Sequence, residues 1–389
     1  MEPVNGTFSS AAGDFAVSGL PRDDDNLPEA VAPLIRNAWY VVSESKNVAH
    51  ELRAIRALGQ PLVLYRTEAG APVVLDDRCA HHRYPLSKSK LIGDNIRCGY
   101  HGFTYESSGR CIWVPGTNAK PKFGVRRYPC VEVGPWLWTW MGDPSKADPS
   151  LVPYPELDRR ENWRQIEGYK LNPGNYMLLI ENLLDLSHLH FLHGSDVSDV
   201  SQATTHSTSL PNLVNGVGYT KETPVAEAKI FARLTGGDPA KKVRVITADM
   251  QLGPSLNYGY EDRYALEGDD DPLYPLRFHI IHGITPEDRD ATHQFFQVFF
   301  NRELLGEGMK GFRDFSENVV LQQDCEAIAE IQKAIDNDRR KGTVEFAVPG
   351  DRYGFAMRRI LRRLKREELV DTDNLQSQKV SLEAGDAPL

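Results

Sequence analysis

Four metal-binding side chains in two short segments constrain this 389-residue chain more than any other feature. One residue separates Cys79 from His81, two separate Cys98 from His101, and sixteen lie between the segments. Thiolates and imidazoles are the common protein ligands of zinc and of iron. Glycines and prolines beside both segments let backbone N–H groups approach a bound centre. The pattern therefore predicts a metal site held between two loops.

The order of the ligands favours one kind of centre over another. A structural zinc site with two cysteines and two histidines usually pairs like with like, whereas here each segment supplies one of each. That order is expected where one iron of a two-iron cluster takes two thiolates and the other takes two imidazoles. With the continuation His101-Gly-Phe-Thr-Tyr105, the pattern resembles the Rieske [2Fe–2S] domain. The resemblance implies that Cys79, His81, Cys98 and His101 bind the cluster; structural zinc is the alternative.

A second group of metal-binding residues lies in the apolar stretch 175–193, which we predict to be helical. Asp185 and His188 are three residues apart and share a helix face. His188 and His193 are five apart, or about 140° around an ideal helix, so they converge only if the helix bends or ends between them. Gly194 follows directly and favours such an ending. The spacing Asp185-x-x-His188-x-x-x-x-His193 resembles the mononuclear-iron motif of the Rieske oxygenases.

That family completes its iron site with a distant carboxylate, as in a two-His-one-carboxylate face with open positions. A helix predicted over 312–336 offers four acids: Glu317, Asp324, Glu326 and Glu330. Asp324 falls on an apolar stripe with Val320, Ile328 and Ile331, whereas Glu326 and Glu330 fall on a polar face. An acid that points into a core is costly unless it is paired or binds a metal. We predict Asp324 as the third iron ligand, with a helix cap or buried ion pair as the alternative.

The resemblance implies roles for other residues. Asp185 would bridge the two centres by accepting hydrogen bonds from an iron-ligand histidine and from His101 of a neighbouring subunit, which implies a head-to-tail homotrimer. Asn182 matches a position near the iron in some members of the family. The alternative, that Asn182 is an ordinary surface residue of the helix, has equal weight. His282 lies in one of several aromatic strand-like runs and is a candidate substrate contact, although such runs more often form core.

The order of segments predicts an α+β chain. It would comprise an N-terminal arm (1–35), an all-β Rieske [2Fe–2S] domain (36–148), a mononuclear-iron catalytic domain with a helix-covered antiparallel sheet (149–350), and a C-terminal helix and tail (351–389).

Composition limits the other classes. The formal charge of −9 argues against general nucleic-acid binding, and no apolar run approaches the length of a membrane helix. Five cysteines in a chain of this length do not form a disulfide framework, and no targeting segment is evident. We therefore expect a soluble, cytoplasmic protein.

One weaker motif concerns the source of electrons. Gly306-Glu-Gly308-Met-Lys-Gly311 fits a dinucleotide fingerprint, but the acid expected about twenty residues later lies within a predicted helix. We interpret it as a glycine turn. Without a nicotinamide or flavin site, the electrons would come from a separate ferredoxin, a flavin reductase, or both.

Together, the two motifs indicate the terminal oxygenase (α subunit) of a Rieske non-haem iron system, with a [2Fe–2S] cluster, one Fe(II) and O₂ as cosubstrate. Pro85-Leu-Ser87 and Gly109-Arg-Cys111 resemble the vanillate and dicamba demethylase branch. This favours monooxygenation, in particular O-demethylation of an aromatic acid. Ring cis-dihydroxylation is the alternative reaction. A Rieske electron carrier is the alternative of another class, and it would not need His188, His193 and Asp324.

Overall fold

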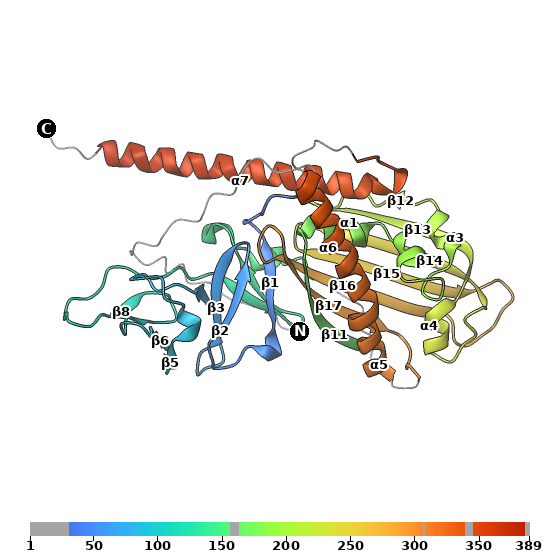
Figure 1. The fold of residues 1–389 in the computed structure, drawn as a ribbon, viewed down its shortest axis with the longest axis horizontal. Coiled ribbons are helices and arrows are strands. Elements are labelled where there is room, and N and C mark those ends of the chain that lie inside the picture. Colours follow the sequence, from blue (N-terminus) through green and yellow to red (C-terminus); the bar gives the residue numbers. More distant parts are fainter. Residues whose placement is uncertain (1–30, 156–162, 306–307, 339–344, 386–389) are drawn as a thin grey trace. The chain divides into compact units, whose positions relative to one another are not determined.

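The computed structural model describes residues 31–155, 163–305, 308–338 and 345–385 (Figure 1). The chain divides into two compact units, with boundaries in the described residues at Trp39 and after Val152. Most of the predicted N-terminal arm, residues 1–30, lies outside the described residues. Its last part, residues 31–35, contributes Ala32 and Ile35 to the hydrophobic core of the second unit.

The first unit consists of short antiparallel strands. Three small sheets have the orders β1-β10-β9, β2-β3-β4 and β5-β6-β7-β8. Their strands are β1 (Trp39–Glu44), β2 (Arg53–Ala57), β3 (Gln60–Arg66), β4 (Pro72–Asp76), β5 (Lys90–Ile92), β6 (Asn95–Arg97), β7 (Thr104–Tyr105), β8 (Cys111–Trp113), β9 (Cys130–Val133) and β10 (Trp136–Trp140). Four 3-10 turns are Ser45–Asn47, Leu86–Lys88, Pro144–Lys146 and Pro149–Leu151. An all-β first region was predicted, and the strand pattern confirms it.

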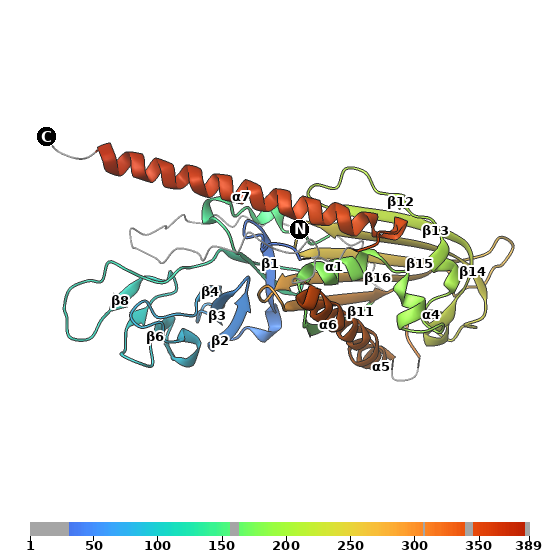
Figure 2. The same cartoon turned by 45° about the horizontal axis from the view of Figure 1, so that its top comes forward.

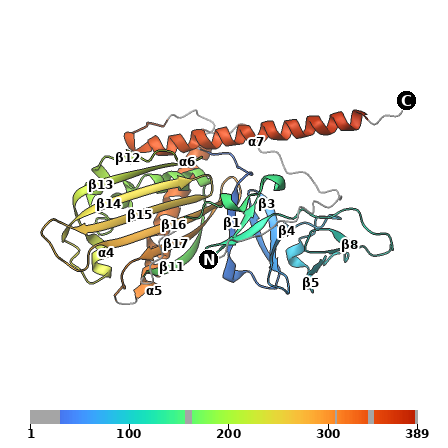
Figure 3. The same cartoon turned by 180° about the vertical axis from the view of Figure 1, so that it is seen from behind.

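The second unit is built on one seven-stranded antiparallel sheet of order β11-β17-β16-β15-β14-β13-β12. The strands are β11 (Arg164–Asn172), β12 (Thr208–Ser209), β13 (Val217–Glu227), β14 (Lys242–Leu252), β15 (Leu256–Ala265), β16 (Leu276–Pro286) and β17 (Thr292–Phe300). Figure 3 views this sheet from behind, with its long strands side by side.

Helices cover one face of this sheet: α1 (Tyr176–Leu184), α2 (His188–Leu192), α3 (Val200–Thr204), α4 (Lys229–Leu234), α5 (Gly308–Phe315), α6 (Leu321–Asp338) and α7 (Arg352–Gly385). The core beneath α1 combines its apolar residues with Tyr219 of β13, Ile284 of β16 and Ile328 of α6. Helix α7 packs against α1 (Figure 2), preceded by a 3-10 turn at Pro349–Asp351. The predicted helix-covered antiparallel sheet is thus confirmed.

Two predicted helices differ in detail. The helix expected over 175–193 is interrupted, because α1 ends at Leu184 and α2 begins at His188. The Asp185 side chain accepts a hydrogen bond from the backbone N–H of Ser187 (3.0 Å), a local bond that competes with helix continuation. Asp185 and His188 were predicted to share a helix face. This prediction is wrong, because the helix is interrupted between them.

The helix expected over 312–336 begins earlier, at Gly308, and contains a π-helical turn at Ser316–Val320 before α6. Ile331, predicted on the buried stripe, is 48% exposed. Gln332 is buried in its place and accepts a hydrogen bond from the N–H of Asn175 (2.9 Å). The buried row follows Asp324, Ile328 and Gln332 at spacings of four residues. Of the glycine motif, residues 306–307 lie outside the described residues, and Gly308 begins α5.

Candidate metal centres

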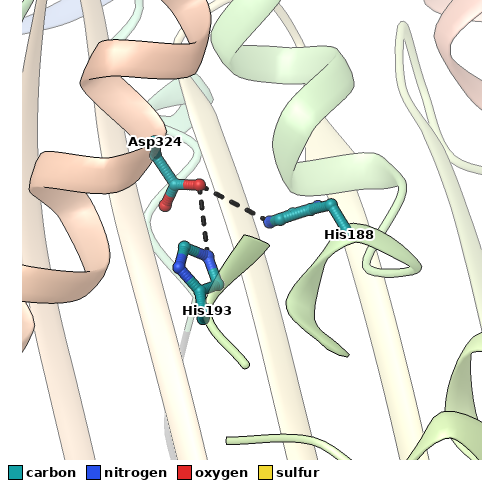
Figure 4. Close-up of side chains that lie close together, drawn as sticks. All are labelled: His188, His193 and Asp324. Atoms are coloured by element: carbon teal, nitrogen blue, oxygen red, sulfur yellow. Dashed lines mark ion pairs between the residues drawn. The ribbon is translucent and has the colours of Figure 1, made fainter. Parts of the chain in front are cut away.

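Three predicted iron ligands converge between α2 and α6. The Asp324 Oδ1 atom lies 3.6 Å from His188 Nε2 and 3.3 Å from His193 Nε2 (Figure 4). The candidate ligand atoms of all three residues lie within 4.8 Å of one another. One short helix supplies both imidazoles: His188 begins α2, and His193 caps its end, followed by Gly194 at φ +91°. This ending was predicted, and it lets two residues five apart face one point.

Hydrogen bonds fix which nitrogen each imidazole presents. His188 Nδ1 lies 2.7 Å from the backbone oxygen of Asp185, and His193 Nδ1 lies 2.9 Å from Oε1 of Gln323. Both partners are acceptors, so each Nδ1 carries the proton and each Nε2 keeps its lone pair. Such bonds orient metal-ligating histidines in general. Within the described part of the chain, the buried Nε2 of His193 has no hydrogen-bond partner.

Asp324 is buried, with 6% of the residue exposed. The Asp324 carboxylate affects the protonation of His193. Burial lowers the pKa of His193, but the neighbouring Asp324 carboxylate outweighs this effect, so the pKa is raised overall. Two imidazole lone pairs and one carboxylate oxygen at one point match a two-His-one-carboxylate set, which suits Fe(II) and leaves coordination positions open. The residues present therefore fit a mononuclear iron.

Asn182 and Asp185 both contact members of this set of three predicted iron ligands. Asn182 Nδ2 donates to Asp324 Oδ1 at 3.1 Å, so Asn182 contacts a predicted ligand and is not simply a surface helix residue. Asp185 contacts His188 through its backbone oxygen, not through the side chain that the resemblance implied. The Asp185 carboxylate packs against Gly350. If residue 350 carried a Cβ atom, that atom would lie 3.2 Å from Asp185 Oδ2, which leaves little room for a larger residue.

His282 lies on β16 and is 2% exposed. Its side chain shares a sheet face with Ile284, which packs in the core with residues of α1 and α6. Burial lowers the pKa of His282 to about 4, against an opposing effect of the Asp324 charge. His282 is therefore a neutral imidazole on the helix-covered face of the sheet.

In the first unit, the four predicted cluster ligands lie on two loops. Cys79 and His81 follow β4, and Cys98 and His101 lie between β6 and β7. Both cysteines are buried, at 2% and 3% exposure, whereas both histidines are exposed, with ring centroids 4.8 Å apart. Buried thiols beneath two outward imidazoles fit a cluster whose histidine-bound iron lies at the surface.

Tyr105 is a further functional candidate. It belongs to the sequence motif, but the motif alone did not indicate its role. Its hydroxyl lies 3.1 Å from Cys79 Sγ and accepts a hydrogen bond from the N–H of Ala80 at 3.0 Å. With that N–H as donor to its oxygen, the hydroxyl proton is free to point at the sulfur. Hydrogen bonds to cluster sulfurs tune the reduction potential.

Comparisons with known proteins agree with both centres. The Rieske [2Fe-2S] domain model matches residues 38–129, and the vanillate O-demethylase oxygenase C-terminal domain model matches residues 173–367. Over 162 residues, the chain is 40% identical to the toluene-4-sulfonate monooxygenase system iron-sulfur subunit of Comamonas testosteroni, covering 41% of this chain and 46% of that protein. It is 36% identical over 161 residues to the dicamba O-demethylase oxygenase component of Stenotrophomonas maltophilia, covering 41% and 48%.

These matches span about half the length of the curated relatives. A longer match, 27% identical over 339 residues, covers 84% of this chain and 94% of the chloroacetanilide N-alkylformylase oxygenase component of Rhizorhabdus wittichii. The fold is similar to that of dicamba monooxygenase bound to dicamba, with a TM-score of 0.77, 24% identity, and coverage of 87% of this chain and 100% of that chain. Among the described residues, none of the helices is both long and apolar enough to cross a membrane.

Proposed function

This chain belongs to the Rieske oxygenases that carry a vanillate O-demethylase oxygenase C-terminal domain, and from that membership we propose that it is a terminal oxygenase that O-demethylates a methoxylated aromatic acid. Of the relatives named above, two act, by their names, on toluene-4-sulfonate and on dicamba, and the third acts on a chloroacetanilide. All three names indicate an aromatic substrate, and the first two indicate an aromatic substrate with an acidic group.

The observation that carries the proposal is the convergence of His188, His193 and Asp324. A Rieske electron carrier would need the Cys79, His81, Cys98 and His101 set alone. A second site with two imidazole lone pairs and a carboxylate has no purpose in such a carrier, but it is the ligand set that non-haem iron oxygenases use.

In this proposal, Cys79, His81, Cys98 and His101 hold the [2Fe–2S] cluster, and His188, His193 and Asp324 hold one iron. When bound, the iron supplies open coordination positions at which O₂ is reduced, and the cluster supplies the electrons. The chain's own residues orient the ligands: Gln323 and the Asp185 carbonyl hold the two Nδ1–H groups, and Asn182 holds one carboxylate oxygen.

The reaction balances with one reductant. A methoxyarene, O₂, NADH and a proton yield a phenol, formaldehyde, NAD⁺ and water, because hydroxylation of the methyl group gives a hemiacetal that releases formaldehyde. A separate protein, a ferredoxin or a flavin reductase, delivers the electrons to the cluster. We further propose a head-to-tail homotrimer, in which the carboxylate of Asp185 meets His101 of the next subunit.

A product assay tests the proposal. Purified holoenzyme receives a surrogate reductase, NADH and a panel of methoxylated and unsubstituted aromatic acids, and formaldehyde and product mass are measured together. We expect formaldehyde to match NADH consumption. A product that gains two oxygens and two hydrogens without formaldehyde would instead establish ring dihydroxylation. Reduction of the cluster without any oxygenated product would establish an electron carrier.

A further inference from the structure

A series of four buried, hydrogen-bonded side chains runs through the second unit from α6 to β16. Cys325 Sγ lies 3.0 Å from Asn172 Oδ1, Asn172 Nδ2 lies 2.9 Å from Gln294 Oε1, and Gln294 Nε2 lies 3.0 Å from His282 Nδ1. None of the four is more than 5% exposed. Buried polar chains of this kind are stable only when each donor meets an acceptor.

The thiol at one end of this hydrogen-bonded series determines the direction of its bonds. A thiol can donate a hydrogen bond to an amide oxygen but is a weak acceptor. Asn172 therefore turns its oxygen to Cys325 and its NH₂ group to Gln294, which must meet it with oxygen. The NH₂ group of Gln294 then faces Nδ1 of His282. The reverse direction would place the NH₂ group of Asn172 against sulfur, its poorest available partner.

This direction fixes the tautomer of His282. Because Nδ1 accepts a hydrogen bond, the single proton of the neutral ring lies on Nε2. The ring stays neutral near pH 7, since burial lowers its pKa to about 4. Two acids bear on this region: Asp324 from α6, whose charge opposes that shift, and Asp249 from β14, which accepts a bond from Asn257, the register partner of His282 on β15.

We propose that Gln294 is a positioning residue that holds His282 as the Nε2–H tautomer, and that this N–H donates a hydrogen bond to an acceptor oxygen of the substrate. The second half rests on the proposed function, whereas the first half does not. The Nε2–H tautomer makes His282 a hydrogen-bond donor at neutral pH. A substrate oxygen such as a carboxylate or an ether would therefore bind, and a group that offers only a donor would be rejected.

The tautomer can be measured without any substrate. The full-length protein is labelled with ring-¹⁵N histidine, with its cluster oxidised and diamagnetic zinc at the mononuclear site. Two-bond ¹H–¹⁵N correlations then distinguish the two tautomers, and the His282→Gln variant identifies the signal. We expect the Nε2–H pattern from pH 5.5 to pH 8. A proton on Nδ1 in the unmodified protein would overturn the inference, whatever reaction the enzyme catalyses.

The substitution Gln294→Glu reverses the bond. At pH 8 the introduced carboxylate accepts from Nδ1–H, which leaves Nε2 without its proton. At pH 6 either the ring or the carboxyl gains a proton, and in both cases Nε2–H is restored. Anaerobic binding of the methoxybenzoate that turns over should therefore weaken about tenfold at pH 8 and recover to nearly the wild-type Kd at pH 6. Because a buried carboxylate also destabilises the fold more at pH 8 than at pH 6, the ring-¹⁵N spectrum of this variant is recorded at both pH values. The proposed tautomer switch predicts Nδ1–H at pH 8 and Nε2–H at pH 6, whereas a merely structural defect leaves the Nε2–H pattern at both.

Two further variants complete the test. Gln297→Glu introduces a carboxyl at a buried position on the same strand, but on the opposite face, and should leave the Kd and its pH dependence unchanged. Gln294→Met removes the bond without a new charge and should weaken binding equally at both pH values. An unchanged Kd in both Gln294 variants would refute the role of Gln294 in positioning His282 for substrate binding, whereas absence of formaldehyde from every substrate would refute only the proposed function.

Discussion

Asp324 illustrates how one carboxylate can organise a site. Its Oδ1 atom faces two imidazoles and also accepts a hydrogen bond from Asn182. A buried carboxylate without compensation is costly, so each of these partners matters to its position. The amide of Asn182 is the only one of the three that would not itself bind iron, so its contribution can be separated from ligation.

Replacing Asn182 should therefore weaken the iron site without removing a ligand. We expect Asn182→Leu to lower the affinity for the mononuclear iron about 10- to 100-fold, as loss of a hydrogen bond to a ligand usually does. Chelator competition followed by iron analysis measures this affinity. Gln322→Leu, which removes a hydrogen-bond donor to the exposed Glu326 on α6, is the control and should retain wild-type affinity.

The sequence predicts the ligands better than it predicts the residues that hold them. Spacing and residue type bring His188, His193 and Asp324 into one hypothesis, because a metal requires few chemical types. Gln323, Gln294 and Tyr105 escape notice because an amide or a phenol is common, and its role depends on which partner the tertiary fold places beside it.

At the scale of elements, the interruption between α1 and α2 is the feature that periodicity could not show. The apolar pattern of 175–193 is continuous, and only the bond from Ser187 N–H to the Asp185 carboxylate marks the break. The π-helical turn before α6 is likewise absent from the apolar pattern. The first irregularity directly precedes α2, which begins with His188, and the second directly precedes α6, which carries Asp324. Local rules are often overridden near functional sites.

An ion pair between the buried Arg358 of α7 and the partly exposed Glu181 of α1 joins the two helices. Arg358, on α7, donates from Nε and Nη2 to both carboxylate oxygens of Glu181 at 2.5 and 2.7 Å, and from Nη1 to Glu345 at 2.8 Å. Removing Arg358 leaves the partly buried Glu181 carboxylate without its cation, so Arg358→Ala should lower the free energy of unfolding, by less than the roughly 3–5 kcal/mol that breaking a fully buried pair costs. Denaturant titration measures this loss. Arg359→Ala, at an exposed neighbouring position, should change it by less than about 0.5 kcal/mol.

Asp249 on β14 gives the sheet a pH-dependent stability. Burial raises the pKa of Asp249 from 3.8 to about 8, against the opposing bond from Asn257. A folded-state pKa above the unfolded value stabilises the protonated form, so this contribution is complete below about pH 4 and is lost as the pH rises towards 8.

We therefore expect Asp249→Asn to gain stability relative to the wild type as the pH rises from 4 to 8, by at most about 1.4 kcal/mol per pH unit. Unfolding curves across this range measure the difference. Asp270→Asn, at an exposed position, is the control and should track the wild type. If the Asp249→Asn and wild-type stabilities ran parallel with pH, the buried carboxyl would not be the titrating group.

At the scale of the whole molecule, each compact unit carries its own set of metal-binding residues, and the proposed trimer pairs the sets of neighbouring subunits. Cys98→Ser should remove the cluster and Asp324→Ala the mononuclear iron, so neither variant should oxygenate substrate alone. Random mixed trimers formed by coexpression should recover about a quarter of the wild-type activity, since that share of the subunit contacts pairs an intact cluster with an intact iron site. No recovery would indicate electron transfer within one subunit.

The most direct test of two separate centres in one chain is a metal and sulfide analysis of the protein purified without oxygen. We expect about three irons and two acid-labile sulfides per chain, which fall to about two irons and two sulfides in Asp324→Ala and stay at three and two in Glu326→Ala. About two irons in the wild type, unchanged by Asp324→Ala, or zinc in place of iron and sulfide in the first unit, would contradict the account.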